Sequence, residues 1–177
     1  MNKIEIPLSK KKISLLFTGA TAFVIFGTLF LITPDTFTSP IFRNNQTIRV
    51  VGIVVVLFFG VVGISVYRKL IDTKIGLTID ENGITDNSNA SSVGLIEWAD
   101  IIEVKSSRVM STKFLLVFTD KPDKYINRTN GFKRTLLKGN IKTYGTPISI
   151  TSNTLKYDFE ELESLIKKSL LDQNEKN

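Results

Sequence analysis

The sequence contains neither cysteine nor histidine in its 177 residues. The absence of cysteine excludes a disulfide framework and thiolate chemistry. The absence of histidine removes the commonest general base near neutral pH and the commonest metal ligand. The chain also lacks a glycine-rich phosphate-binding loop and a nucleophile elbow. We therefore predict a protein that is not an enzyme, with no catalytic residues, no metal site and no cofactor.

Charge is missing from two long apolar runs, residues 13–32 and 50–67, which also lack asparagine and glutamine. A helix of the first run's length is about 30 Å long, which matches the hydrocarbon core of a bilayer. The first run is too long for the apolar part of a signal peptide, and no small-residue cleavage site follows it. We predict two transmembrane helices, and their lack of polar side chains argues against a pore or transporter acting alone.

Glycines in these runs allow the two helices to pack closely on each other or on a partner, or reflect only the frequency of glycine in membrane helices. They are Gly19, Gly27, Gly52, Gly60 and Gly63.

Positive residues flank the outer ends of the two runs. Residues 10–12 are lysines, and residues 68–74 contain three more cations, whereas the connecting segment 33–49 has two arginines and one aspartate. Because positively charged flanks stay in the cytoplasm, we expect both termini there and the connecting segment outside. Residues 1–67 carry six basic residues against two acidic ones, and residues 68–177 carry seventeen against fifteen. Most of the positive excess therefore surrounds the membrane segments, and we predict no nucleic-acid partner.

After residue 70 the sequence changes to short alternating runs separated by turn residues, which is typical of β-strands. The six expected strands cover residues 75–80, 83–87, 93–98, 101–109, 113–120 and 146–151. A tight turn at residues 81–83 joins the first two strands. The acidic residues around this turn faintly resemble a calcium loop, but their spacing and the flanking strands favour a hairpin.

Three helices are expected in the same region. Pro122 is a suitable helix start and Asn130-Gly131 a suitable stop, and a second helical piece could cover residues 132–141. Residues 158–171 have acids first, lysines later and one apolar face, which indicates an amphipathic helix capped by Asp158. We assign residues 70–172 to a cytoplasmic domain and residues 173–177 to a tail.

This arrangement indicates an antiparallel half-barrel closed by a C-terminal helix. The motifs GLTIDENGITDN, GLIEWADIIEV and YGTPISI, with the terminal helix, resemble an uncharacterised bacterial two-span membrane protein family with a pleckstrin-homology-like (PH-like) cytoplasmic domain. The resemblance extends to the IEIPLSKKK type of N-terminus. It implies an α+β protein of the bacterial inner (cytoplasmic) membrane, in which a two-helix transmembrane hairpin precedes the PH-like domain. It implies no activity.

The expected strands depart from a PH-like barrel in number, because six follow the membrane segments and such a barrel needs seven. The helical insert at residues 121–145 is also unusual for that fold. The N-terminal segment, residues 1–12, offers a solution, since Ile4, Ile6 and Leu8 alternate with charged residues as in an edge strand. We predict that this segment pairs with the open sheet, where Pro7 is tolerated at an edge.

The only tryptophan, Trp98, lies between two carboxylates, Glu97 and Asp100. Strand alternation places Trp98 on the same face as Ile96, and Asp100 can bond nearby backbone N–H groups and hold a turn. We interpret Trp98 and Asp100 as structural anchors of a corner between two strands. The alternatives are a ligand-stacking indole and a catalytic carboxylate.

Residues 121–142 contain seven basic residues against Asp123 alone, and the aromatic residues Tyr125, Phe132 and Tyr144 lie among or just after them. This insert could dock on anionic lipid headgroups or an acidic partner, or be a solvated helical face that balances the acidic terminal helix. The candidate lipid- or partner-binding residues are Lys124, Arg128, Lys133, Arg134, Lys138 and Lys142. We therefore expect a membrane-anchored binding or adaptor module whose domain contacts anionic headgroups or a protein partner. The alternative is an accessory subunit that packs through its hairpin on a larger transporter or envelope complex.

Overall fold

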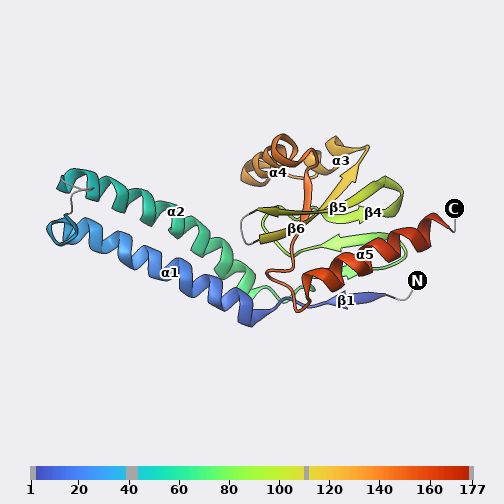
Figure 1. Ribbon diagram of the computed structural model, residues 1–177, viewed down its shortest axis with the longest axis horizontal. Coiled ribbons are helices and arrows are strands. Elements are labelled where there is room, and N and C mark those ends of the chain that lie inside the picture. The colour runs from blue at the N-terminus through green and yellow to red at the C-terminus, as the bar shows by residue number, and fades with distance from the viewer. Residues whose placement is uncertain (1–2, 39–43, 110–111, 176–177) are drawn as a thin grey trace. The chain divides into compact units, whose positions relative to one another are not determined.

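Figure 1 shows the computed structural model of the protein, which describes residues 3–38, 44–109 and 112–175. The chain divides into two compact units. One unit is Lys10–Asp72, and the other combines Met1–Ser9 with Thr73–Asn177. The first unit is therefore inserted into the sequence of the second, between Ser9 and Thr73.

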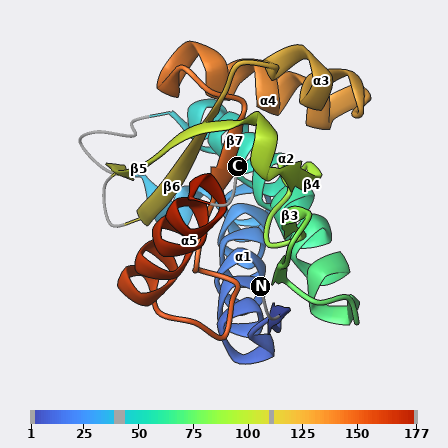
Figure 2. The ribbon, with the colours of Figure 1, turned by 90° about the vertical axis from the view of Figure 1, so that its right-hand side faces the viewer.

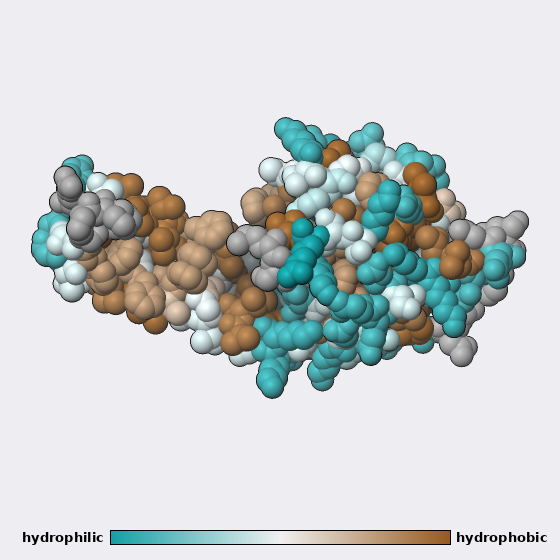
Figure 3. Space-filling view, viewed as in Figure 1, coloured by the Kyte–Doolittle hydropathy of each residue, from teal (hydrophilic) through white to brown (hydrophobic). Residues whose placement is uncertain are grey.

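The inserted unit consists of two long helices. Helix α1 covers Lys10–Ile32, the short helix η1 covers Pro34–Phe37, and α2 covers Asn45–Ile71. Both α1 and α2 are long and apolar enough to cross a membrane, and apolar side chains cover their surface (Figure 3). The helices extend beyond the uncharged runs because lysine and arginine favour helix formation.

Lysine 10 closes the end of this helical pair. The Nζ atom of Lys10 donates to the carbonyl oxygen of Leu70 at 2.6 Å and to that of Asp72. These carbonyl groups lie at the C-terminus of α2, where helical hydrogen bonding ends and a positive charge is favoured. The first residue of α1 is thereby bonded to the last turn of α2.

The two helices approach most closely at a pair of glycines. A Cβ atom on Gly52 would lie only 2.8 Å from the carbonyl oxygen of Gly27, and one on Gly27 would lie 3.2 Å from that of Gly52. Such distances require glycine on both helices, which is also the rule at close crossings of membrane helices. Nearby, the rings of Phe23 and Phe59 stack with centroids 4.2 Å apart.

We predict that Gly52→Ala separates the two helices. A Cβ atom on Gly63 would lie 3.9 Å from the Cβ atom of Ala20, which is within the range of a disulfide. The double variant Ala20→Cys/Gly63→Cys should therefore cross-link under oxidation, and Gly52→Ala should reduce its yield. Gly60→Ala is the matched control, because nothing lies within 4 Å of that position. Equal cross-linking with Gly52→Ala and Gly60→Ala would contradict the close crossing.

The second unit contains, in its described residues, seven strands in two antiparallel sheets. The first sheet has the order β1-β2-β3-β4 and the second the order β5-β6-β7. The strands are β1 (Ile4–Ile6), β2 (Leu77–Ile79), β3 (Gly83–Asp86), β4 (Gly94–Glu97), β5 (Ile101–Val109), β6 (Thr112–Thr119) and β7 (Ile148–Ile150). The six strands predicted after residue 70 are present, with ends that differ by at most two residues.

Strand β1 lies at the edge of the first sheet. It pairs directly with β2, although the helical unit separates the two strands in the sequence. Ile4 lies opposite Ile79 and Ile6 opposite Leu77. The chain after β1 bonds to a second segment, since the amide of Ser9 donates to Thr154 at 2.7 Å and Pro7 accepts from the amide of Lys156 at 2.9 Å. The N-terminal segment is thus held between the sheet and the segment that precedes the last helix.

Three helices complete this unit. Helices α3 (Pro122–Asn127) and α4 (Gly131–Tyr144) connect β6 to β7, and α5 (Phe159–Asn174) follows β7. The pair α3 and α4 lies on one side of the strands and α5 on the other (Figures 1 and 2). Asp158 caps α5 by accepting from the amide of Glu160 at 2.9 Å. The prediction of a tail from residue 173 is wrong for Gln173 and Asn174, because α5 continues to Asn174.

The hydrophobic core lies between the two sheets and α5. Its fully buried members come from every layer, including the N-terminal strand and the segment before α5. They include Ile6, Leu77, Ile79, Ile84, Ile96, Leu115, Val117, Ile148, Ile150, Leu155, Leu162 and Ile166.

Candidate functional site

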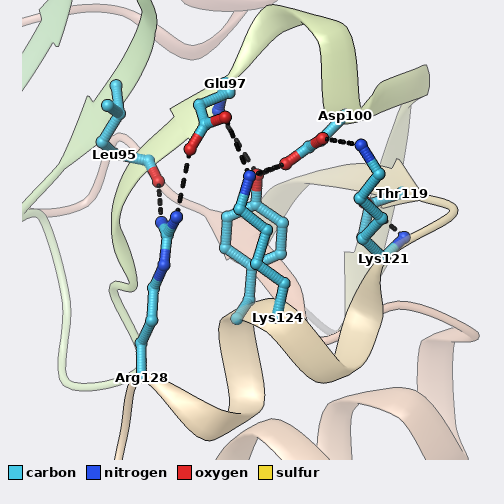
Figure 4. A network of polar contacts seen from close by, with 8 residues as sticks. Leu95, Glu97, Asp100, Thr119, Lys121, Lys124 and Arg128 are labelled. Carbon is cyan, nitrogen blue, oxygen red and sulfur yellow. Dashed lines mark hydrogen bonds and ion pairs between the residues drawn. The ribbon is translucent and has the colours of Figure 1, made fainter.

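The corner between the two sheets carries a buried carboxylate. The short helix η2 (Trp98–Asp100) joins β4 to β5, and the side chain of Asp100 is only 1% exposed. Its oxygens accept from Lys121 Nζ at 2.6 Å, from Lys124 Nζ at 2.5 Å and from the Tyr125 hydroxyl at 2.8 Å. Figure 4 shows Lys124 reaching the corner from α3 and Lys121 reaching it from the position before this helix.

A second carboxylate extends this network along β4. Glu97 pairs with Lys124 at 2.8 Å and with Arg128 at 3.1 Å. Arg128 also donates to the carbonyl oxygen of Leu95 at 2.8 Å, and the Tyr125 hydroxyl accepts from the amide of Glu97 at 3.3 Å. Hydrogen bonds and ion pairs therefore join helix α3 to both β4 and the corner.

Ionisation in this network follows from its contacts. Burial opposes the charge on Asp100, but hydrogen bonds from Lys121, Lys124 and Tyr125 outweigh it and hold the pKa of that carboxyl well below its usual range. Burial and the hydrogen bond to Asp100 raise the pKa of Tyr125 to about 12. Hydrogen bonds from Lys124 and Arg128 lower the pKa of Glu97. Both carboxylates are therefore ionised at neutral pH.

This electrostatic state bears on whether either carboxylate could act as a general acid. A general acid needs a carboxyl group that remains protonated near neutral pH. Asp100 and Glu97 are instead ionised and share Lys124 as a partner. Their geometry is that of an ion-pair network that joins two elements, and it offers no proton donor to a substrate.

Trp98 is buried beside this network. The residue is 7% exposed, and its indole Nε1 atom donates to the carbonyl oxygen of Asp80 at 2.8 Å. A ligand-stacking indole needs an open ring face, which this burial does not leave. The prediction for Asp100 is corrected in one respect, since it accepts from side chains of the helical insert and not from nearby backbone N–H groups.

The structure divides the six predicted binding residues into two groups. Lys124 and Arg128 are engaged by Glu97 and Asp100. Lys133, Arg134, Lys138 and Lys142 all belong to α4, and none of these four forms an ion pair within the residues that the structure describes. Helix α4 itself contains no acidic residue.

Helix α4 separates its cations from its apolar face. Leu137 is fully buried against the rest of the unit, whereas Arg134, Lys138 and Lys142 are exposed. These three follow one another at intervals of four residues, which places them on one side of a helix. Phe132, at the start of α4, is 68% exposed. We call the exposed residues Phe132, Arg134, Lys138 and Lys142 together the α4 outer face, within which Phe132 lies on another side of the helix from Arg134 because the two are only two positions apart.

Sequence reasoning missed Tyr125 and Lys121 as partners of Asp100. Both lie more than twenty residues along the chain from it, and local spacing carries no signal for such a contact. The sequence feature that indicates burial of Tyr125 is the short apolar pair Tyr125-Ile126 inside the basic insert.

No protein-family model, curated protein or solved structure matches this chain. Within the described ranges, no group of three or more Asp and Glu side chains is close enough to hold a metal ion.

We predict that Asp100→Asn lowers the free energy of unfolding by about 2 kcal/mol at pH 7, because two lysines and a buried hydroxyl lose a charged acceptor. The pKa of Asp100 in the folded state lies below its unfolded value near 4, so its ionised form stabilises the fold above about pH 4 and this contribution is lost as the pH falls further. Asp100→Asn should lack that acid-range loss. Urea unfolding followed by Trp98 fluorescence measures both effects.

Asp123→Asn is the control for this experiment, since Asp123 is an exposed carboxylate on α3, the helix that supplies Lys124 and Tyr125 to Asp100. It should change the stability far less than Asp100→Asn and keep the acid-range loss. Equal effects of the two variants would show that the buried network is not what joins α3 to the corner.

Proposed function

We propose that this protein is a membrane-anchored, non-enzymatic binding module. Helices α1 and α2 anchor it in the bacterial inner membrane, both termini lie in the cytoplasm, and the α+β unit is a PH-like domain. Two antiparallel sheets with seven strands in all, followed by a C-terminal helix, support this interpretation. A PH-like barrel needs seven strands; six follow the membrane segments in the sequence, and β1 supplies the seventh.

The observation that carries the proposed function is the α4 outer face. It combines three exposed cations with one exposed aromatic ring, on a helix without acids. Lys124 and Arg128 show the contrast, since these cations of the same insert are paired with Asp100 and Glu97. A basic helical surface with a protruding aromatic side chain is suited to anionic lipid headgroups, with the ring entering the headgroup region.

The strength of such docking depends on the membrane anchor. Each cation near an anionic leaflet contributes about 1 kcal/mol, so three cations give only weak attraction for a free domain. The connectors from the helical unit to β1 and β2 are short, residues 7–9 and 72–76. Because they keep the domain close to the bilayer, the effective lipid concentration is high and weak attraction suffices.

A second candidate function is that of an accessory subunit that packs through its hairpin on a larger membrane complex. The observation that favours it is a groove of about 210 Å³ between α1 and α2, lined by Phe17, Ala20, Val24, Phe59 and Gly60 among others. Nothing lies within 4 Å of the position of a Cβ atom on Gly60. A helix of another protein could approach the groove closely there.

Lipid docking is tested with the full chain in nanodiscs. The chain has no cysteine, so Thr135→Cys, on the exposed side of α4, gives a single site for an environment-sensitive dye. In nanodiscs with anionic phosphatidylglycerol, compared with pure phosphatidylcholine, the emission should shift to the blue. The shift should be lost in Arg134→Gln/Lys138→Gln/Lys142→Gln, which removes attraction worth about a hundredfold in binding, and at high salt.

The control removes the same charge elsewhere, with Lys156→Gln/Lys167→Gln/Lys168→Gln, all exposed. It should retain the blue shift. An emission that is identical in the two lipid compositions, or equal losses in the two triple variants, would refute docking through the α4 outer face and favour the accessory subunit.

A further inference from the structure

The four edges of the two sheets differ in how their backbone groups are used. Strands β1 and β4 form the edges of the first sheet, and β5 and β7 form those of the second. In an antiparallel edge strand, alternate residues direct both their N–H and their C=O group away from the sheet. Such a row of groups pairs readily with another extended chain unless it is covered.

The edge at β4 is covered by α3. The outward carbonyl oxygen of Leu95 accepts from Arg128 at 2.8 Å, and the outward amide of Glu97 donates to the Tyr125 hydroxyl at 3.3 Å. Leu95 and Glu97 are alternate residues of this strand, so both of their outward groups belong to one row. Helix α3 therefore closes this edge with side chains.

The edges at β7 and β1 are covered in other ways. The carbonyl oxygens of Pro147 and Ser149 accept from the side-chain amides of Asn140 and Asn89 at 3.1 and 3.0 Å. Strand β1 has only three residues, and its continuation through Ser9 bonds to residues 154–156. Lys3 and Glu5, which form an ion pair, and Pro7 add the charged and proline residues that typically protect an edge.

Strand β5 is the exception. It is the longest strand, with nine residues, and it pairs on one side with β6. In the part of the chain that the structure describes, no other group bonds to the backbone of residues 102–107. Two apolar side chains near its ends are exposed, Ile102 at 64% and Val109 at 41%.

A cleft of about 250 Å³ adjoins this open edge. Ser106 and Ser107 line it from β5, and Phe159, Glu160 and Glu163 line it from α5. Because the side chains of these two serines are small, they leave the backbone in the middle of the strand accessible. The carboxylates are already partly neutralised, because Glu160 pairs with Lys113 and Glu163 with Lys167.

We propose that β5 is a docking site for an extended segment of a partner protein, which adds to the second sheet as a strand beside α5. An extended backbone is the occupant whose donors and acceptors match an open strand edge along its length. The segment carries an apolar side chain near each end, opposite Ile102 and Val109, and an uncharged polar side chain in the cleft. This site lies outside the α4 outer face and does not depend on lipid docking.

The test begins with a library of random peptides of about 10 residues, long enough to cover the strand, displayed on phage. The library is selected on the full chain in phosphatidylcholine nanodiscs, and one enriched peptide is synthesised. Amide hydrogen exchange is then measured with and without that peptide. The amides of residues 102–107 that face away from β6 should exchange quickly in the free protein and at least tenfold more slowly with the peptide.

Two proline variants supply a matched pair. Ser106→Pro and Ser107→Pro each remove one amide, and alternation requires that one of the two faces β6 and the other faces outward. The variant that retains the melting temperature should lose at least tenfold in peptide affinity. If both variants unfold the domain, the exchange measurement still decides the question.

Three results would overturn the proposal. One is a library without any enriched binder, and another is a binder that protects other residues while leaving residues 102–107 unchanged. The third is slow exchange of these amides in the free protein together with a dimer in light scattering, which would show that a second copy closes the edge. The variant Arg134→Gln/Lys138→Gln/Lys142→Gln should bind the peptide normally, so failure of lipid docking and failure of this site are distinguishable.

Discussion

The pairing of β1 with β2 is the constraint on which the rest of the structure depends. These strands are neighbours in the sheet, yet the whole helical unit lies between them in the chain. Closing so long a loop costs conformational entropy, and the packing of α1 on α2 reduces this cost by bringing its ends together. The bond from Lys10 to the carbonyl oxygen of Leu70 fixes those ends. The first sheet is thereby coupled to the helical pair through the chain itself.

The charges of the helical insert have two different physical roles. Around Asp100, cations satisfy a buried carboxylate and hold α3 against β4, so their charge is used within the fold. On α4 the cations have no acidic partner among the described residues, and their charge is directed to solvent. The first group also closes a sheet edge, which leaves β5 as the long strand whose edge is open. The two surfaces proposed for docking are therefore on α4 and β5.

Local patterns in the sequence predicted much of the fold. Alternation located the strands, including β1, and the two uncharged runs predicted α1 and α2. The sequence did not reveal that Lys124 and Arg128 pair with Asp100 and Glu97, because those contacts join residues far apart in the chain. The local rule for Asp100, bonding to nearby amides, was wrong because the charged donors Lys121 and Lys124 form stronger hydrogen bonds with its carboxylate. The expected end of the last helix was too early because polar residues such as Gln173 favour helix nearly as well as apolar ones.

The most direct test of the account is the thermal unfolding of the α+β unit after removal of β1. Residues 2–7 are deleted from the full chain in nanodiscs, and Trp98 fluorescence reports the unfolding of this unit. Because the deletion removes buried Ile6 and exposes an edge of β2, the account predicts a melting temperature at least about 10 °C lower, whereas Glu5→Ala should change it little. An unchanged melting temperature after the deletion would contradict the claim that β1 completes the domain.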